Sequence, residues 1–466
     1  MTHRTHVALV IAVAGLAFSF VPLSAVAGSA RAKATSDIVW APATLVFSGH
    51  GWGHGVGLSQ YGAYGYAQHG YTYDQIVAHY FPGTDLEPAG SKTIRVLLAG
   101  AAPSLTISSS MPFSITDSDG SSHDLVNLSV TVTSSLKVDL GDGNGEVALS
   151  GPLQIAAGSK PLEYAGHQYR GTFRVFVVGD KLRLVNHVGL ENYLYGVVPC
   201  ESPHDWPAEA LKAQAVVART YALGSIAPNA DFDVYKDTRS QVYLGLSHEY
   251  PESTAAVKAT SGESVYYDGE LARTFFFSTS GGRTVAIRDA WPKAKREPYL
   301  VSVNDPYDDT SPYHNWGPVT VSSRTLAKLL HIKGPVSDLK TKANASKRVA
   351  TATIIGADDE TSQVTGDSVK QALGLRSSWF RATVLALQYP RDAVTSGAKL
   401  RLKGRARNAK SPALETRLPG GDWQKIRDLS PDSSGLFKVT LRPTTTADYR
   451  LVAEGAIGAP VRIKVS

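Results

Sequence analysis

Residues 47–63 read FSGHGWGHGVGLSQYGA and place five glycines at alternate positions. Glycine adopts positive φ and lets another backbone or a ligand approach closely, whereas interior glycines weaken a plain strand. Trp52, His54 and Gln60 lie between or just after these glycines. Such a mixture of aromatic and polar side chains suits the wall of a site in which a polar, ring-shaped ligand lies flat. The alternative is a Gly-rich turn with surface histidines, and this stretch alone leaves both open.

Two short helices are expected after the glycines. Ser59 is a good N-cap for a helix over residues 60–69, and the TYDQ sequence at 72–75 predicts a capping box for the second helix. The phosphate-loop pattern G-x-x-x-x-G-K-[ST] is absent. His50 and His54 lack the third adjacent ligand that zinc requires, so we expect no metal here.

The N-terminus has the features of a signal peptide. A weakly positive start is followed by the apolar residues 8–21 and by the small-residue sequence Ala25-Val26-Ala27. Cleavage after Ala27 would leave residues 28–43 as a loose leader. No other stretch is apolar enough to span a membrane. The sequence therefore predicts an exported protein without a membrane span after cleavage.

Charge and cysteine content narrow the partners. The net charge is +6 and the isoelectric point is near 9.1, which favours anionic partners such as an acidic cell wall or a lipid surface. No basic run with interleaved aromatics is present, and export also argues against nucleic acid. Cys200 is the single cysteine, so an internal disulfide and a Cys-based zinc site are excluded. We expect no cofactor.

The length of 466 residues suggests two or three domains. Residues 103–162 are rich in Ser, Thr, Val and Gly-Asp turns and predict an inserted β-module. Residues 382–466 show alternating strands between Pro, Gly, Ser and Asp turns, which predicts an immunoglobulin-like β-sandwich with a spacer or wall-binding role. The fold class expected for the whole is α+β.

Glu201 is the acid with the most chemical interest. Pro199 and Pro203 frame it in what we expect to be a rigid loop before a helix that runs to about residue 223. Partial burial raises the pKa of a carboxyl group, as a general acid requires, and glycosidic cleavage generally uses carboxylates. Alternatively, Glu201 caps the helix or pairs with Lys212 or Arg219, which project from one face of it.

Three other patterns leave their function open. Cys200 next to His204 in sequence resembles a thiol nucleophile with a base, but a buried small residue is the simpler explanation. The sequence STSGG at 278–282 predicts a turn that either lines a site or is a plain loop. The acidic sequence NDPYD at 304–308 lacks the D-x-[DN]-x-[DN]-G pattern of a calcium loop.

Several of these motifs together resemble the SpoIID/LytB family. The resemblance covers roughly residues 44–380, with gaps at the β-module. It rests on motifs that occur in this order after the Gly-rich stretch: YLYGVVPCESP from Tyr193, ALKAQAVVARTYA from Ala210, DTRSQVY from Asp237, FSTSGG from Phe277, PYLVSV from Pro298 and GLRS from Gly374. The Gly-rich stretch itself resembles the GWGHGVGMSQ-type motif of that family.

The resemblance implies a catalytic domain over residues 44–380. The family contains lytic transglycosylases that cleave the glycan strands of peptidoglycan, and its catalytic glutamate lies in a VPxE motif, here at Glu201. We expect a secreted, cell-wall-associated lyase that acts between MurNAc and GlcNAc and leaves a 1,6-anhydro product. The expected substrate-binding residues are Trp52, His54, Ser59, Gln60, Lys212, Arg219, Tyr221, Ser278 and Ser280.

Two alternatives remain beside this interpretation. One is a non-catalytic wall-binding or amidase-enhancing protein, with cell-wall amidases as partners. The other is an inverting hydrolase that uses Asp205 or Glu209 as base. Two departures from the family also matter: its Gly-rich motif usually follows the core domain, and some members bind zinc partly through cysteines. We therefore predict that the Gly-rich stretch folds back and forms one wall of the groove that contains Glu201.

Overall fold

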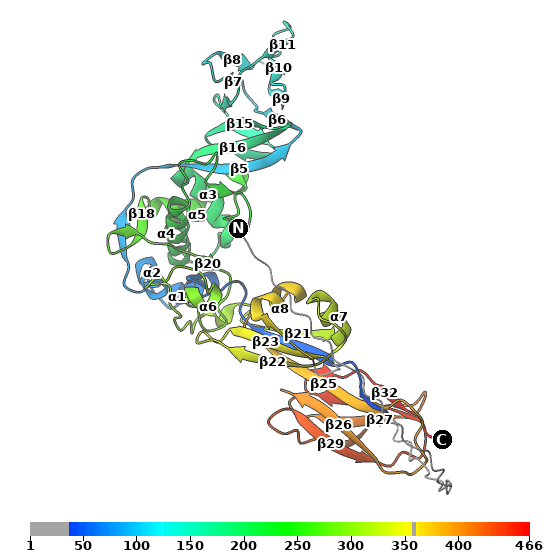
Figure 1. The fold of residues 1–466 in the computed structure, drawn as a ribbon. Coiled ribbons are helices and arrows are strands. Elements are labelled where there is room, and N and C mark those ends of the chain that lie inside the picture. Colours follow the sequence, from blue (N-terminus) through cyan, green and yellow to red (C-terminus); the bar gives the residue numbers. More distant parts are fainter. Residues whose placement is uncertain (1–36, 126, 357–359) are drawn as a thin grey trace, which may run out of the picture.

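The computed structural model describes residues 37–125, 127–356 and 360–466. The predicted signal peptide and most of the predicted leader lie outside these residues. The chain is elongated: a β-rich part, a helical centre and a second β-rich part follow one another along its length (Figure 1). Helices and several sheets together make the fold α+β, as predicted. Within the described residues, no helix is long and apolar enough to cross a membrane.

The first β-rich part is built on one seven-stranded sheet. Its strands, in spatial order, are β17 (Val234–Tyr235), β5 (Thr93–Ala102), β16 (Lys181–Gly189), β15 (Thr172–Val178), β12 (Leu153–Ala156), β7 (Phe113–Thr116) and β8 (Ser122–Leu125). β15 and β16 form a hairpin around the turn at Gly179-Asp180. Since β7, β8 and β12 extend the sheet of β5, β15 and β16, the predicted insertion is continuous with the core.

Smaller sheets complete this part. They contain β6 (Ser104–Ser108), β9 (Ser129–Thr133), β13 (Leu162–Tyr164) and β14 (His167–Tyr169) in one sheet, and β10 (Lys137–Asp139) and β11 (Glu146–Ala148) in another. Buried side chains from all of these strands except β11, among them Leu105, Val132 and Val138, share a hydrophobic core with the helical centre.

The helical centre is organised around the buried helix α4 (Ala208–Gly224). The surrounding elements are α1 (Gln60–Gln68), α2 (Tyr73–Tyr80), α3 (Leu190–Glu201), α5 (Pro251–Ala259), α6 (Ile287–Ala290), β4 (Asp85–Pro88), β18 (Glu263–Tyr267) and β19 (Glu270–Leu271). One face of α4 packs Leu211 and Ala215 into the first core, and another packs Ala213 and Val217 into a second core with α1 and α2. Small side chains on both faces permit this close packing.

The Gly-rich stretch begins as a strand and then folds back onto the helical centre. β2 (Thr44–His50) lies between β21 (Asn315–Ser322) and β25 (Phe380–Pro390). β3 (Leu58–Ser59) pairs in parallel with β20 (Phe276–Phe277). Between β2 and β3 the glycines have positive φ, and a Cβ on Gly51 would lie 2.6 Å from the Thr279 carbonyl oxygen. The expected loose leader also differs, because Ile38–Trp40 form β1 against β25.

The last part consists of two sheets that pack face to face. One continues from β25 to β26 (Leu400–Arg407) and β29 (Leu436–Leu441); the other contains β27 (Ala413–Arg417), β28 (Gln424–Asp428), β30 (Ala447–Ala453), β31 (Ala456–Ile457) and β32 (Val461–Ile463). Leu402 and Phe437 of one sheet meet Leu414 and Leu451 of the other. The immunoglobulin-like strand order stays a prediction.

β25 belongs to two cores at once. Val384 and Ala386 face a core that includes α7 (Ser323–Leu329), α8 (Gly366–Leu373), β22 (Val336–Ala343) and β23 (Val349–Gly356), which pairs with β24 (Thr361–Thr365). Leu385 and Leu387 face the core between the two last sheets. The boundary predicted at residue 382 therefore falls inside a strand that both parts share.

Candidate functional site

A cavity of about 640 Å³ lies between the Gly-rich stretch, the end of α3 and the loops around β20. Its lining residues are Trp52, Gly53, His54, Gln60, Glu201, Tyr221, Thr238, Arg239, Ser240, Phe275, Phe276, Phe277, Ser278, Trp291 and Lys370. Aromatic side chains alternate with hydroxyl, amide and charged groups around it. This composition fits a polar ligand with apolar ring faces.

Glu201 is the only carboxylate among these described lining residues. It is the last residue of α3, so the proline-framed loop expected from the sequence is the C-terminal end of a helix that contains Pro199. The Val242 amide donates a hydrogen bond of 2.8 Å to Oε1 of Glu201. Burial raises the pKa of this carboxyl group, while the Val242 amide and the Gln60 side chain oppose the rise. Glu201 is therefore placed to hold a proton and release it within the cavity.

Gln60 joins the Gly-rich stretch to the acid. Its Nε2 donates to the backbone carbonyl oxygen of Glu201 at 3.0 Å, although 141 residues separate the two in sequence. Both residues line the same cavity. The prediction that the Gly-rich stretch folds back to form one wall of the Glu201 groove is confirmed.

Trp52 is an exposed aromatic face held by a rigid frame. Its side chain is 41% exposed, and its backbone exchanges two hydrogen bonds with Thr279, of 2.8 and 3.1 Å. The Tyr313 ring meets it edge to face at 4.5 Å between centroids. The Arg376 guanidinium lies 4.9 Å from the Trp52 ring centroid and 4.0 Å from that of Tyr313. A ligand would therefore meet an indole whose position is already fixed.

His54 is neutral in this site. Its Nδ1 accepts a hydrogen bond from the Val56 amide at 3.0 Å, and its ring packs against Phe277 and Trp291. Burial lowers the pKa of His54 to about 4, despite the hydrogen bond to the Phe276 backbone. The imidazole is thus a fixed wall of the cavity and carries no charge near neutral pH.

The structure divides the remaining predicted substrate-binding residues into two groups. Tyr221 and Ser278 line the cavity, whereas Ser59, Lys212, Arg219 and Ser280 do not. Ser59 is buried and caps α1 by accepting from the Gly62 amide at 3.2 Å.

The other three residues that do not line the cavity each contact a carboxylate outside it. Lys212 pairs with Glu209 at 2.6 Å, the fully buried Arg219 pairs with Glu191 at 2.7 Å, and the buried Ser280 donates to Asp308 at 2.8 Å. These four side chains therefore stabilise the fold around the site. The same pairs exclude the alternative that Glu201 is the ion-pair partner of Lys212 or Arg219.

Competing catalytic arrangements lack the required neighbours. Burial raises the pKa of the Cys200 thiol to about 11, the opposite of what a thiolate nucleophile needs. His204 stacks on Tyr250 at 3.9 Å. Glu209 accepts from the Tyr73 amide and from Lys212, and neither Glu209 nor Asp205 lines the cavity.

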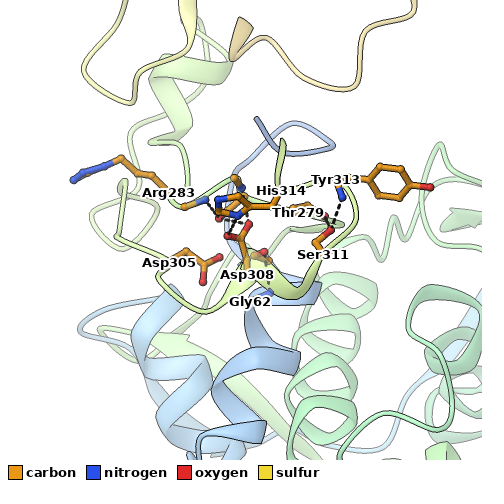
Figure 2. A network of polar contacts seen from close by, with 12 residues as sticks. Gly62, Thr279, Arg283, Asp305, Asp308, Ser311, Tyr313 and His314 are labelled. Atoms are coloured by element: carbon orange, nitrogen blue, oxygen red, sulfur yellow. Dashed lines mark hydrogen bonds and ion pairs between the residues drawn. The ribbon is translucent and has the colours of Figure 1, made fainter. Parts of the chain in front are cut away.

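The turn at 278–282 rests on a buried polar network centred on Asp308 (Figure 2). Asp308 accepts from Ser280 Oγ at 2.8 Å, from the Gly281 amide at 2.6 Å and from His314 Nδ1 at 2.7 Å. Ser311 adds a hydrogen bond to Thr279 at 2.7 Å, and the Tyr313 ring points away from the network. The network therefore fixes the backbone that holds Trp52 and Tyr313. Among the residues described, no three His, Cys, Asp or Glu side chains are grouped to hold a metal ion.

The sequence missed several lining residues. Thr238, Arg239 and Ser240 lie in the DTRSQVY motif, so the signal was present but no role was assigned to it. Lys370 of α8 reaches the cavity from a helix 169 positions after Glu201 and pairs with Asp367 at 3.3 Å. No local pattern marks Lys370, because only the packing of α8 brings it to the cavity.

Comparisons with known proteins show which chains this sequence is similar to. Residues 178–267, which include Glu201, match the family described as Stage II sporulation protein, SpoIID. Stage II sporulation protein D of Bacillus amyloliquefaciens is 32% identical over 217 residues (42% of this chain, 60% of that protein). The Bacillus subtilis protein of the same name is 32% identical over 216 residues (42% and 61%).

An amidase enhancer of Bacillus subtilis is 32% identical over 185 residues, which are 38% of this chain and 24% of that protein. The chain thus spans less than two thirds of the length of each of these relatives. No solved structure matches.

Proposed function

Because the chain belongs to the SpoIID family and its relatives have cell-wall-related names, we propose that it is a peptidoglycan lytic transglycosylase. The observation that carries this proposal is Glu201, a carboxyl group with a raised pKa and the only carboxylate among the described residues that line the cavity. A glycan strand is the substrate, and its sugar rings would lie against Trp52 and the other aromatic walls. No cofactor takes part in the proposed reaction.

One carboxyl group suffices for the reaction. Protonated Glu201 donates its proton to the oxygen that links MurNAc to GlcNAc, and the C1–O bond of MurNAc breaks. The resulting carboxylate accepts the proton of the MurNAc C6 hydroxyl while O6 bonds to C1. The products are a 1,6-anhydro end and a free GlcNAc end, and Glu201 regains its proton. An inverting hydrolase would instead need a second carboxylate about 6.5–9.5 Å away to activate water.

Glu201→Gln is expected to reduce cleavage by about 10²–10⁴-fold, because general acid–base catalysis contributes this much. Purified glycan strands, with and without stem peptides, would be digested and their products weighed; anhydro ends are lighter than hydrolysed ends by one water. Asp205→Asn and Glu209→Gln are the matched controls, since both change a carboxylate outside the cavity. Near-normal turnover by a folded Glu201→Gln protein, or hydrolysed ends as the main product, would contradict the proposal.

The second candidate is an amidase-enhancing function, favoured by the similarity to the amidase enhancer. The cavity would then bind glycan without cleaving it, and a cell-wall amidase would be the partner. Strand binding without cleavage by the wild-type protein, with equal stimulation of an amidase by wild type and Glu201→Gln, would support this candidate. Export to the cell wall is part of both proposals.

A further inference from the structure

The positive charge of this protein is concentrated in its C-terminal sheets. Residues 382–466 contain 15 Lys and Arg but only 7 Asp and Glu, a net charge of +8 against +6 for the whole chain. The proposed catalytic part therefore carries no net positive charge. A polyanion would be drawn to the C-terminal part alone.

Strand alternation places part of this charge on one open face. β26 turns Leu400 and Leu402 into the core between the sheets, so Arg401 and Lys403 point to the opposite face, where they are exposed. β29 does the same with Lys438. We call Arg401, Lys403 and Lys438 the basic face.

The basic face lies next to the part of this sheet that Trp40 and β22 cover. Further along β26, Arg405 lies over the Trp40 ring at 5.4 Å and donates to the Ser337 carbonyl oxygen of β22 at 3.1 Å. Arg405 and Arg407 both pair with the buried Asp338, at 3.2 and 2.7 Å. The two arginines beneath β22 thus share one carboxylate within the protein.

The cations of the basic face have no such counter-charge. Lys403 and Lys438 are direct register partners on antiparallel strands, and like charges in opposed positions destabilise a sheet. No ion pair is formed by Lys403, Lys438 or Arg401 with any residue that the structure describes. An external anion would relieve this repulsion.

A hollow of about 510 Å³ lies on this face. Its walls include Ile38, Gln388, Arg401, Lys403, Lys438 and Thr440. Arg401 and Lys403 are two positions apart on one strand, which separates their side chains by about 7 Å along it. The amide of Gln388 and the hydroxyl of Thr440 add groups that can bind hydroxyls between two anionic centres.

We propose that the basic face binds an anionic cell-wall polymer whose charges are phosphodiesters separated by a polyol. Lysines bind phosphate as point charges, and arginine can bind two of its oxygens at once. A polyol phosphate chain offers repeated charges with hydroxyls between them, and the hollow offers both cations and groups that bind hydroxyls. The C-terminal sheets would then hold the protein on the wall while the cavity around Glu201 meets the glycan. This inference does not depend on catalysis.

The test measures binding of the full-length protein to purified cell walls that retain their phosphodiester polymers. The same walls after chemical removal of those polymers are the second probe. The variant is Arg401→Gln/Lys403→Gln/Lys438→Gln. The matched control is Lys410→Gln/Lys425→Gln/Arg427→Gln, which removes the same charge from exposed positions on β28 and in the loop before β27. Thermal unfolding of each variant verifies that it folds.

The basic-face variant is expected to bind intact walls at least about tenfold more weakly than the control, because each cation near an anionic surface contributes about fivefold. The wild-type protein should bind stripped walls more weakly than intact walls, by the same factor. Its binding to intact walls should also weaken as the salt concentration rises. Equal binding by the two variants, or undiminished binding to stripped walls, would overturn the proposal. The proposal would also be overturned if the protein bound anionic lipid vesicles or duplex DNA as tightly as intact walls and this binding required the basic face. Binding that remains on stripped walls measures binding of glycan by the cavity around Glu201. The Glu201→Gln variant should bind the phosphodiester polymer as the wild type does.

Discussion

At the scale of single residues, burial decides which carboxyl groups keep a proton. Asp305 is buried and Glu201 is half-buried, and desolvation is the main reason that the pKa of each is raised. Asp308 is equally buried, but three donors surround it. The sequence predicted the raised pKa of Glu201. It gave no sign of Asp305, since an Asn-Asp-Pro sequence usually lies in an exposed turn.

Asp305 should make stability depend on pH. Burial and the nearby charge of Asp308 raise the pKa of Asp305 to about 7, although the hydrogen bond from the Tyr80 hydroxyl opposes the rise. Its stabilising contribution is complete below the pKa of the unfolded chain, near 4, and is lost as the pH rises to about 7. Thermal unfolding at pH 4.5 and pH 8 should therefore show a smaller difference for Asp305→Asn than for wild type.

The control for this prediction is Asp309→Asn, which changes an exposed neighbour. It should leave the wild-type pH dependence intact. The asparagine at 305 can still accept the hydrogen bond of the Tyr80 hydroxyl, which is 2.9 Å long in the native protein. If Asp305→Asn keeps the full difference between the two pH values, Asp305 is ionised in the folded protein and the assigned shift is wrong.

At the scale of elements, helix α1 contains Gly62 and Gly65, although glycine has a low helix propensity. The helix needs these two glycines for close packing. A Cβ on Gly62 would lie 1.9 Å from the Tyr80 hydroxyl and 2.4 Å from Asp305 Oδ2, and a Cβ on Gly65 would lie 1.9 Å from the Tyr307 carbonyl oxygen. These contacts bring α1 against α2 and the loop that follows Asn304. The close approach places Gln60, at the start of α1, beside Glu201.

Gly62→Ala is expected to lower the free energy of unfolding by about 1–3 kcal/mol, the usual cost of overpacking a filled site. The added methyl group should also displace α1 and with it Gln60, so cleavage should fall as well. Gly224→Ala is the matched control: Gly224 ends α4, its Cβ would meet no atom within 4 Å, and alanine favours helices by up to about 1 kcal/mol. Denaturant unfolding would measure both. Equal stability of the two variants would show that α1 does not need this close approach.

At the scale of the whole molecule, strand β2 holds the centre and the last sheets together. β2 lies between β21 and β25, with Leu45 and Phe47 in one core and Val46 in the other. The Ala459 amide donates to the Thr44 hydroxyl at 2.9 Å across 415 residues of sequence. Segments from both ends of the described chain therefore share one sheet.

A chain that lacks residues 44–84 should lose cleavage and unfold at a lower temperature than the intact protein. Its two hydrophobic cores would lose β2, and α4 would lose its packing against α1 and α2. Calorimetry of the shortened and intact proteins would measure the loss. An unchanged unfolding temperature together with unchanged cleavage would show that the Gly-rich stretch is an independent appendage.

Local patterns determined much of the site. The alternating glycines and Trp52 predicted a wall, and the proline-framed Glu201 predicted an acid. Each of these rests on neighbours a few positions apart, where backbone preference and side-chain spacing act directly. The resemblance to a known family linked these motifs to one another before any distance was known.

Only the tertiary structure decided what depends on distant partners. Lys370 reaches the cavity and Ser59 turns into the core because of where α8 and α1 pack. Arg219 meets Glu191 across two helices, so it is unavailable to Glu201. β25 belongs to two cores because β2 lies beside it. A domain boundary predicted from composition cannot show that one strand is shared by two cores. A side chain of one type serves as ligand, cap or ion-pair partner according to which distant residue it meets, and sequence spacing does not contain that distance.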